Sequence, residues 1–156
     1  GKQINLPYHC RAFRVYEGIW IQKDGEKEDD SEKKNQIKSL TSAFTFRIID
    51  RNSQNLEIPK NKYTKWFDYD KINVKLQIRF RQEGDYFLLD DSGRKKKLKD
   101  YFINEKIPRE DREKIPLLVD GKHVLWIVGY RISAYYKVTG NTARILEVHY
   151  NGGNKQ

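Results

Sequence analysis

The chain has 156 residues, which suits one domain at roughly 100 to 200 residues per domain. Its 31 Lys and Arg residues against 22 Asp and Glu residues give a formal net charge of +9, which favours polyanions such as nucleic acids as partners. A content of 37% apolar and 13% aromatic residues excludes a disordered basic tail, and a single cysteine excludes an internal disulfide. We therefore expect one folded basic domain over residues 1–156.

No stretch reaches the 18 or so apolar residues of a membrane span, and residues 1–7 lack the apolar segment of a signal peptide. We therefore expect a soluble, cytoplasmic protein with no membrane partner. The sequence contains no methionine, even at position 1. This absence predicts a piece of a longer protein, with Gly1 as a remnant of a tag.

In chain order, the first predicted elements are strands. Residues 11–21 resemble an opening hairpin, and residues 24–35 form a run of mixed charges that predicts a solvated loop. Apolar residues alternate with polar ones at 44–48 and at 75–81. This period of two is typical of strands with one buried face.

Two helices follow. Leu98, Tyr101 and Phe102 are spaced i, i+3 and i+4, which predicts a helix at about 96–106. A second, short helix is predicted at about 108–114, because a proline suits its first position, acidic residues fill its first turn, and another proline follows its end.

The C-terminal part predicts strands again. Asp120-Gly121 lies between the apolar runs 117–119 and 123–128, which is a strong hairpin signal, and residues 144–150 read as a closing strand. This order of elements predicts a compact, β-rich α+β domain. The apolar faces predict one core, made of Leu76, Ile78, Phe80, Leu98, Phe102, Leu118, Leu125, Ile127, Leu146 and Val148.

The sequence offers little for catalysis. It has no glycine-rich phosphate loop, and His9 next to Cys10 is a poor metal pair because adjacent side chains seldom reach the same ion. Asp85 with Asp90 or Asp91 would be the carboxylates of a small hydrolase, although such residues more often cap turns or pair with cations. We assign no catalytic residue, metal ligand or cofactor to this chain.

The positive charge is concentrated in the second part of the chain. Residues 94–156 carry 14 basic and 7 acidic side chains, and the densest cluster is 94–99. Cations at the start of the predicted helix are unfavourable for the helix dipole. One interpretation is a solvated lysine-rich turn; the other is a phosphate site, in which the same cations become favourable and Arg79 and Arg81 extend the surface from a neighbouring strand.

Five stretches together form a recognisable pattern: LQIRFRQEGDYF at 76–87, KKLKDYFI at 96–103, IPR at 107–109, REKIPLL at 112–118 and WIVGYRI at 126–132. They resemble the C-terminal domain of bacterial tRNA(Ile)-lysidine synthetase. The likeness extends over residues 63–148, whereas residues 1–60 match only loosely and 24–35 looks like a lineage-specific loop.

The resemblance implies a function that composition does not show. The full enzyme is an ATP-dependent ligase that adenylates the wobble cytidine of an isoleucine tRNA and attaches lysine. ATP and lysine are used by an N-terminal catalytic domain with a Ser-Gly-Gly-x-Asp-Ser loop, which this sequence lacks, so the chain alone should be inactive. The C-terminal domain, similar in fold to a domain of the phenylalanyl-tRNA synthetase β chain, is implied to grip the acceptor-stem side of the tRNA.

The charge pattern and the resemblance together make nine basic residues candidate RNA contacts: Arg79, Arg81, Lys95, Lys96, Lys97, Lys99, Arg109, Arg112 and Arg131. A competing hypothesis is a dimerisation or interdomain docking module whose positive face meets an acidic surface of the same protein. Its partners would be the protein's own N-terminal catalytic domain or, in a homodimer, a second full-length copy.

Overall fold

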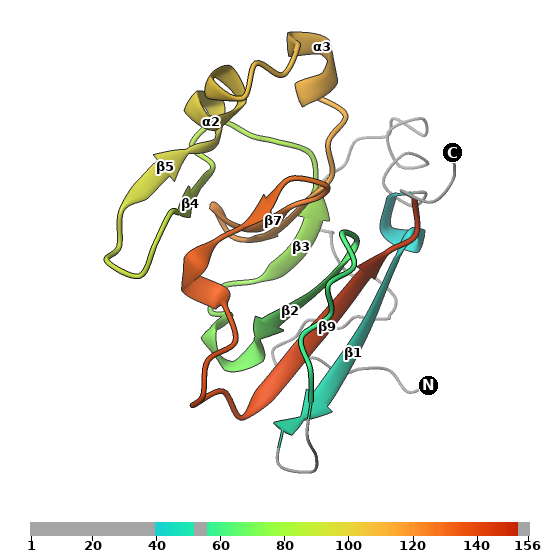
Figure 1. The fold of residues 1–156 in the computed structure, drawn as a ribbon. Coiled ribbons are helices and arrows are strands. Elements are labelled where there is room, and N and C mark those ends of the chain that lie inside the picture. Colours follow the sequence, from blue (N-terminus) through green and yellow to red (C-terminus); the bar gives the residue numbers. More distant parts are fainter. Residues whose placement is uncertain (1–39, 52–55, 153–156) are drawn as a thin grey trace.

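The computed structural model describes residues 40–51 and 56–152, which form two β-sheets connected by loops and short helices (Figure 1). This confirms the predicted β-rich α+β class. The two sheets are packed against each other, and the helices lie at one end of the larger sheet. The elements are β1 (Phe44–Asp50), β2 (Thr64–Asp68), η2 (Tyr69–Lys71), β3 (Leu76–Arg79), β4 (Tyr86–Leu88), β5 (Lys95–Lys97), α2 (Leu98–Asn104), α3 (Arg109–Arg112), β6 (Leu117–Asp120), β7 (His123–Ile127), β8 (Arg131–Ile132), η3 (Ala134–Tyr136) and β9 (Arg144–Tyr150).

The smaller sheet has the strand order β1-β9-β2, and both outer strands are antiparallel to β9. The predicted strands at 44–48 and 144–150 are confirmed as β1 and β9. Leu146 and Val148 are fully buried, whereas Glu147 between them is half-buried on the other face. This alternation is the expected result of the two-residue period of a strand.

The larger sheet has six strands in the order β3-β6-β7-β4-β5, with β8 beside β7. The predicted hairpin is confirmed, because β6 and β7 are antiparallel and Asp120 is opposite His123. Gly121 begins the two-residue turn with a φ of 71°, a conformation that glycine adopts without steric cost. Strand β4 is parallel to β7, which places β5 at the edge of the sheet.

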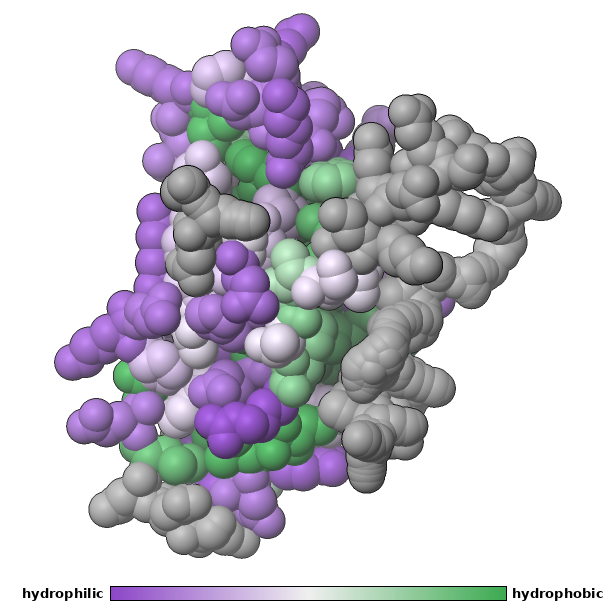
Figure 2. Space-filling view, turned by 90° about the vertical axis from the view of Figure 1, so that its right-hand side faces the viewer, coloured by the Kyte–Doolittle hydropathy of each residue, from purple (hydrophilic) through white to green (hydrophobic). Residues whose placement is uncertain are grey.

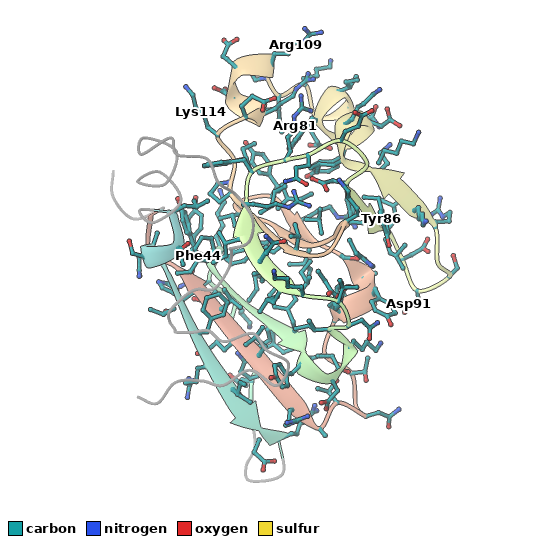
Figure 3. The ribbon with its side chains drawn as sticks, turned by 180° about the vertical axis from the view of Figure 1, so that it is seen from behind. Phe44, Arg81, Tyr86, Asp91, Arg109 and Lys114 are labelled. Atoms are coloured by element: carbon teal, nitrogen blue, oxygen red, sulfur yellow. The ribbon has the colours of Figure 1, made fainter. Side chains whose placement is uncertain are left out.

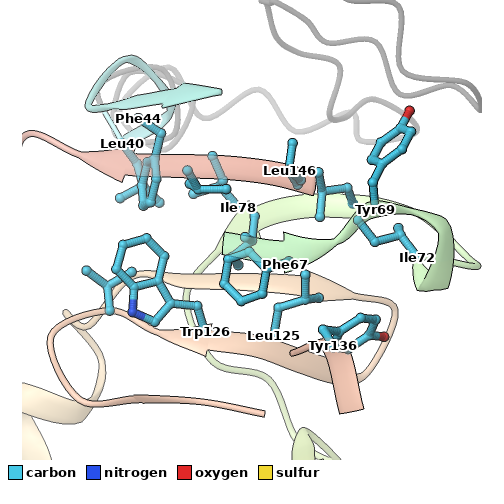
Figure 4. Packing of buried hydrophobic residues seen from close by; sticks show 14 residues of the cluster. Leu40, Phe44, Phe67, Tyr69, Ile72, Ile78, Leu125, Trp126, Tyr136 and Leu146 are labelled. Atoms are coloured by element: carbon cyan, nitrogen blue, oxygen red, sulfur yellow. The ribbon is translucent and has the colours of Figure 1, made fainter. Parts of the chain in front are cut away.

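The apolar side chains form two clusters, not the single predicted core. The first cluster lies between the two sheets and contains Phe67, Leu118, Leu125 and Trp126 (Figure 4). The second lies on the other face of the larger sheet and contains Phe102. The prediction was wrong because β6 and β7 are buried on both faces, and a sequence pattern cannot tell which face each residue joins.

The ten predicted core residues divide between these clusters. Leu98, Phe102 and Ile127 belong to the second cluster, and six others belong to the first. Phe80 is half-buried at the margin of the first cluster. The apolar character of these positions is therefore a good guide to burial, but it does not show how the core is divided.

The first helix starts later than predicted. It spans Leu98–Asn104, and Lys95–Lys97 form strand β5, which is antiparallel to β4. The Leu98 N–H donates to the Asp85 carbonyl oxygen. The lysine cluster is therefore an edge strand and not the first turn of a helix. The short helix is confirmed at Arg109–Arg112, with Pro108 as its N-cap residue.

Some predictions concern the part of the chain that the structure does not describe. The opening hairpin at 11–21, the charged loop at 24–35, and the His9-Cys10 pair lie outside the described residues. Among the helices that are described, none has the length and apolar character needed to cross a membrane.

Candidate nucleic-acid interface

Arg79 is held inside the protein by its strand. Its guanidinium forms two hydrogen bonds of 2.8 and 2.9 Å to the Asp85 carboxylate, and it also donates to the carbonyl oxygens of Phe80 and Gly121. Only 12% of the Arg79 side chain and 1% of the Asp85 side chain are exposed. Such a two-pronged, buried pair fixes the loop between β3 and β4, and it leaves little of Arg79 to reach a ligand.

Three further candidate arginines are half-buried and use part of their guanidinium internally. Arg81 pairs with Glu113 at 2.9 Å, and Arg112 donates to the Ile107 carbonyl oxygen at 2.7 Å. Arg131 lies over the Phe87 ring, 5.3 Å from its centroid. These three arginines connect segments around the second cluster, and each presents only part of its surface to solvent.

The β5 lysines differ from these arginines. Lys95 and Lys97 are exposed and flank the half-buried Lys96, as expected for alternation along a strand. Register places Lys97 opposite Tyr86 and Lys96 opposite Phe87, so the two exposed lysines share the face of Tyr86. Within the described residues, none of the three lysines forms an ion pair.

A surface pocket of about 370 Å³ lies along this strand. Its lining combines three ammonium groups, an aromatic ring, a glycine and a single carboxylate: Gly84, Tyr86, Lys95, Lys96, Lys97 and Asp100. This composition suits an anionic group, because cationic side chains outnumber the acid.

Lys99 and Arg109 are exposed on the two helices. Figure 2 shows hydrophilic side chains over the end of the molecule where α2 and α3 lie, and Figure 3 labels Arg109 and Lys114 there. Residues 98–116 contain five basic and five acidic side chains, so this end has no net charge. The β4–β5 hairpin, residues 86–97, has four basic and two acidic side chains. Of the nine candidates, three thus lie on the positive strand β5 and three at the neutral helical end, whereas Arg79, Arg81 and Arg131 lie outside both regions.

Aromatic residues adjoin the β5 lysines. From the sequence, Tyr135 could stack on a nucleotide, although core packing was the more usual fate, whereas Tyr86 and His123 were not identified as site residues. The rings of Tyr86 and His123 have centroids 4.8 Å apart, and those of His123 and Tyr135 are 5.4 Å apart. Lys95 lies over Tyr86 and Lys71 over Tyr135. The only available signal was aromatic residues within basic surroundings, because these residues come from separate segments that the fold brings together.

The carboxylates do not form a hydrolytic site. Asp85 is occupied by Arg79 and by the Gln82 N–H. Hydrogen bonds from Ser92 and Arg94 lower the pKa of Asp90 to about 2, which makes it a poor proton acceptor. Asp91 is exposed at the tip of the hairpin (Figure 3). Among the residues described, no three His, Cys, Asp or Glu side chains could share a metal ion.

Residues 76–149 match the family model for the TilS substrate C-terminal domain. A tRNA(Ile)-lysidine synthase of Clostridium acetobutylicum is 40% identical over 95% of this chain and 34% of its own length. A tRNA(Ile)-lysidine synthase of Caldanaerobacter subterraneus is 38% identical over 96% and 33%. The chain thus spans about a third of the length of these curated relatives. A solved structure described as the TilS C-terminal domain aligns with a TM-score of 0.54 and 27% identity, over 69% of this chain and 82% of that one.

Proposed function

Because residues 76–149 of this chain belong to the family of TilS substrate C-terminal domains, we propose that the chain binds tRNA as part of a tRNA(Ile)-lysidine synthase. The observation that carries this proposal is strand β5. It presents two exposed lysines and one half-buried lysine in consecutive positions, without an ion pair in the described structure. An uncompensated row of cations favours binding of a phosphate backbone.

The binding mode follows from the shape of stem RNA. Its major groove is too deep and narrow for side chains to read, so proteins bind the phosphates and 2′-hydroxyls. We therefore assign Lys95 and Lys97 to the central phosphate contacts, with Lys96 beside them. Lys99 and Arg109 extend the contact surface along the helices. Arg79 acts from within, because it fixes the loop that leads into β4.

The three half-buried arginines are proposed both to stabilise the fold and to contact RNA. Arg81, Arg112 and Arg131 each use one part of the guanidinium within the protein. The remaining N–H groups are available to donate to an RNA oxygen at the edge of the basic surface. We expect them to contribute less to affinity than the exposed lysines.

We further propose that the complete protein is a tRNA(Ile)-lysidine synthase. ATP and lysine are used by a catalytic domain outside this chain, and the ligand is the acceptor-stem side of an isoleucine tRNA in the cytoplasm. Two relatives are tRNA(Ile)-lysidine synthases, which supports the assignment of the complete protein to such an enzyme. The likeness in fold to a domain of the phenylalanyl-tRNA synthetase β chain stays a prediction.

A different role for the lysines has a physical basis. Strand β5 is at the edge of its sheet, and lysines on edge strands prevent pairing with another sheet. Such lysines protect the protein from aggregation and need not touch RNA. Binding measurements on matched charge variants separate the two explanations.

The test is a titration of the chain with an isoleucine tRNA at two salt concentrations. Lys95→Glu with Lys97→Glu is compared with Lys106→Glu with Lys114→Glu, which changes the net charge equally at the neutral end. We expect the β5 pair to weaken binding by more than tenfold. It should also flatten the slope of log affinity against log salt by about 0.7 to 0.9 for each phosphate that is no longer bound. The control pair should weaken binding much less.

Two results would contradict the proposal. Equal losses in both double variants would show that binding follows net charge and not this strand. Parental affinity in the β5 variant would leave aggregation control as the role of the lysines. Sedimentation of the chain at several concentrations tests the dimerisation hypothesis, which requires self-association without RNA.

A further inference from the structure

A row of three aromatic rings lies next to the β5 lysines. Tyr86 lies in β4, His123 begins β7, and Tyr135 lies in η3. Neighbouring ring planes are inclined by only 35° and 33°. Rings at these separations and angles are tilted but in contact, so the row has one outer ring at each end, Tyr86 and Tyr135.

Each end of the row carries an ammonium group. Lys95 Nζ is 4.4 Å from the Tyr86 centroid, and Lys71 Nζ is 5.0 Å from the Tyr135 centroid. Lys71 also donates to the Tyr135 carbonyl oxygen. Neither lysine forms an ion pair within the described residues. Because no carboxylate of the described residues holds either ammonium, both can bind phosphates next to the aromatic row.

The support beneath the row is rigid. Ser133 Oγ accepts hydrogen bonds from the N–H groups of Leu88 and Tyr135 and lies 2.8 Å from His123 Nε2. Because two N–H groups occupy the oxygen's lone pairs, its hydroxyl proton points at Nε2, and His123 is the acceptor. Tyr136 packs edge-on against His123 and donates to the buried Asp120 carboxylate at 2.8 Å. These contacts fix the rings in place before any ligand arrives.

The exposure of the row differs from that of a packed core. Tyr135 is 37% exposed, and Tyr86 and His123 are half-buried. By contrast, Tyr136 beside them is 1% exposed. A rigid, accessible aromatic surface lies here between two lysines that form no ion pair in the described structure. This chemistry suits unpaired nucleotides, since bases stack on such rings and phosphates pair with cations.

We propose that Tyr86, His123 and Tyr135 form a stacking platform for an unpaired nucleotide that leaves the RNA stem, with Lys71 and Lys95 binding the adjacent phosphates. This inference rests on the proposed binding of stem RNA by the β5 lysines. A base that stacks on Tyr135 takes the place of the Lys71 ammonium, which then turns to the phosphate. The domain would thereby recognise the junction between a stem and a single strand.

The test uses two RNA hairpins with the same stem, one blunt and one with a single-stranded 3′ extension that carries 2-aminopurine. We expect the extended hairpin to bind the chain at least fivefold more tightly and its fluorescence to be quenched on binding, since stacking on aromatic residues stabilises by an amount of this order. Tyr135→Leu should remove both effects, and Tyr135→Phe should keep them. Tyr130→Leu is the matched control, because Tyr130 is 49% exposed but lies outside the row.

A second variant guards against loss of folding in Tyr135→Leu. Lys71→Gln leaves the rings intact and should reduce the preference for the extended hairpin while the melting temperature stays that of the parent. Equal affinity of the parent for the blunt and extended hairpins would overturn the stacking platform and leave the proposed stem binding standing. If neither hairpin binds, the proposed function fails, and the platform fails with it.

Discussion

The arginines around Asp85 and Glu113 and the lysines of β5 use positive charge in opposite ways. Arg79 commits its guanidinium to one buried carboxylate and two carbonyl oxygens, and Arg81 pairs with Glu113. Lys95 and Lys97 are exposed and form no ion pair in the described structure. A basic residue in a positively charged segment can therefore belong either to the interior or to the proposed binding surface. Its hydrogen-bond partners decide which of the two it is.

Removing one cation from each region should have very different effects on stability. Arg79→Met should destabilise the fold by about 3 to 5 kcal/mol, because it leaves the Asp85 carboxylate buried without its partner. Lys97→Met should change the free energy of unfolding by less than about 0.5 kcal/mol. Urea denaturation followed by circular dichroism measures both. Similar stabilities for the two variants would mean that the Arg79–Asp85 pair is not part of the framework.

His123 lies between the two regions. Like an interior side chain, it should affect the stability of the fold when its charge changes. Burial, with a smaller contribution from Lys95, lowers its pKa from 6.5 to about 4. The unfolded chain therefore binds this proton first, and stability should fall as the pH decreases from about 6.5 towards 4. The shift corresponds to at most about 3 kcal/mol, and partial exposure should reduce the loss to about 1 to 2 kcal/mol.

The measurement is the melting temperature across that pH range in the parent and in His123→Gln. The variant should lose the part of the pH dependence that belongs to this side chain, while the contribution of the carboxylates at the lower end stays. Identical pH profiles would show that His123 titrates freely and that Ser133 does not hold it as an acceptor.

Removal of a single lysine from β5 should change the salt dependence of RNA binding. Lys97→Gln should flatten the slope of log affinity against log salt for stem RNA by about 0.7 to 0.9, which is the effect of one phosphate contact. Its melting temperature should stay that of the parent, because the ammonium has no ion-pair partner among the described residues. Lys114→Gln, at the neutral end, is the control. An unchanged slope for Lys97→Gln would remove this residue from the interface.

The smallest expected effect concerns Arg81 and Glu113. Their exposed fractions are 28% and 59%, so water screens the pair. A double-mutant cycle with Arg81→Met and Glu113→Gln should give a coupling free energy of about 0.2 to 1 kcal/mol. A value near that of the buried Arg79 pair would place Arg81 in the interior group and withdraw it from the candidate RNA contacts.

Strands β1 and β3 could be predicted from the sequence because their apolar residues alternate with polar ones. The β6–β7 hairpin could be predicted because Asp120-Gly121 lies between two apolar runs. Strands β4, β5 and β8 have only two or three residues, so they offer no period to detect. Lys95–Lys97 looked like the start of a helix because the periodic residues begin at Leu98. Pairing with β4, a tertiary interaction, decides their conformation.

The candidate site was predictable only in part. Charge density located Lys95–Lys97 as the densest basic cluster, and in the structure these residues form a strand in which Lys95 and Lys97 are exposed. The sequence could not show that Arg79 is committed to Asp85, because both signs of charge are common throughout the chain. Nor could it join Tyr86, His123 and Tyr135, which are separated by up to 49 positions. Tyr86 and His123 meet through the parallel pairing of β4 with β7, and η3 adds Tyr135.

Strand β9 has a consequence for the order in which the protein folds. It is the central strand of the smaller sheet and the last strand that the structure describes. Glu147 in β9 is opposite Arg47 in β1, 100 positions earlier. During synthesis, strands β1 and β2 therefore lack their partner strand β9 until residues 144–150 have been added. Closing so long a loop is slow. We expect a ribosome-bound chain that ends before residue 144 to expose the apolar face of the larger sheet, and so to need protection from aggregation until β9 emerges.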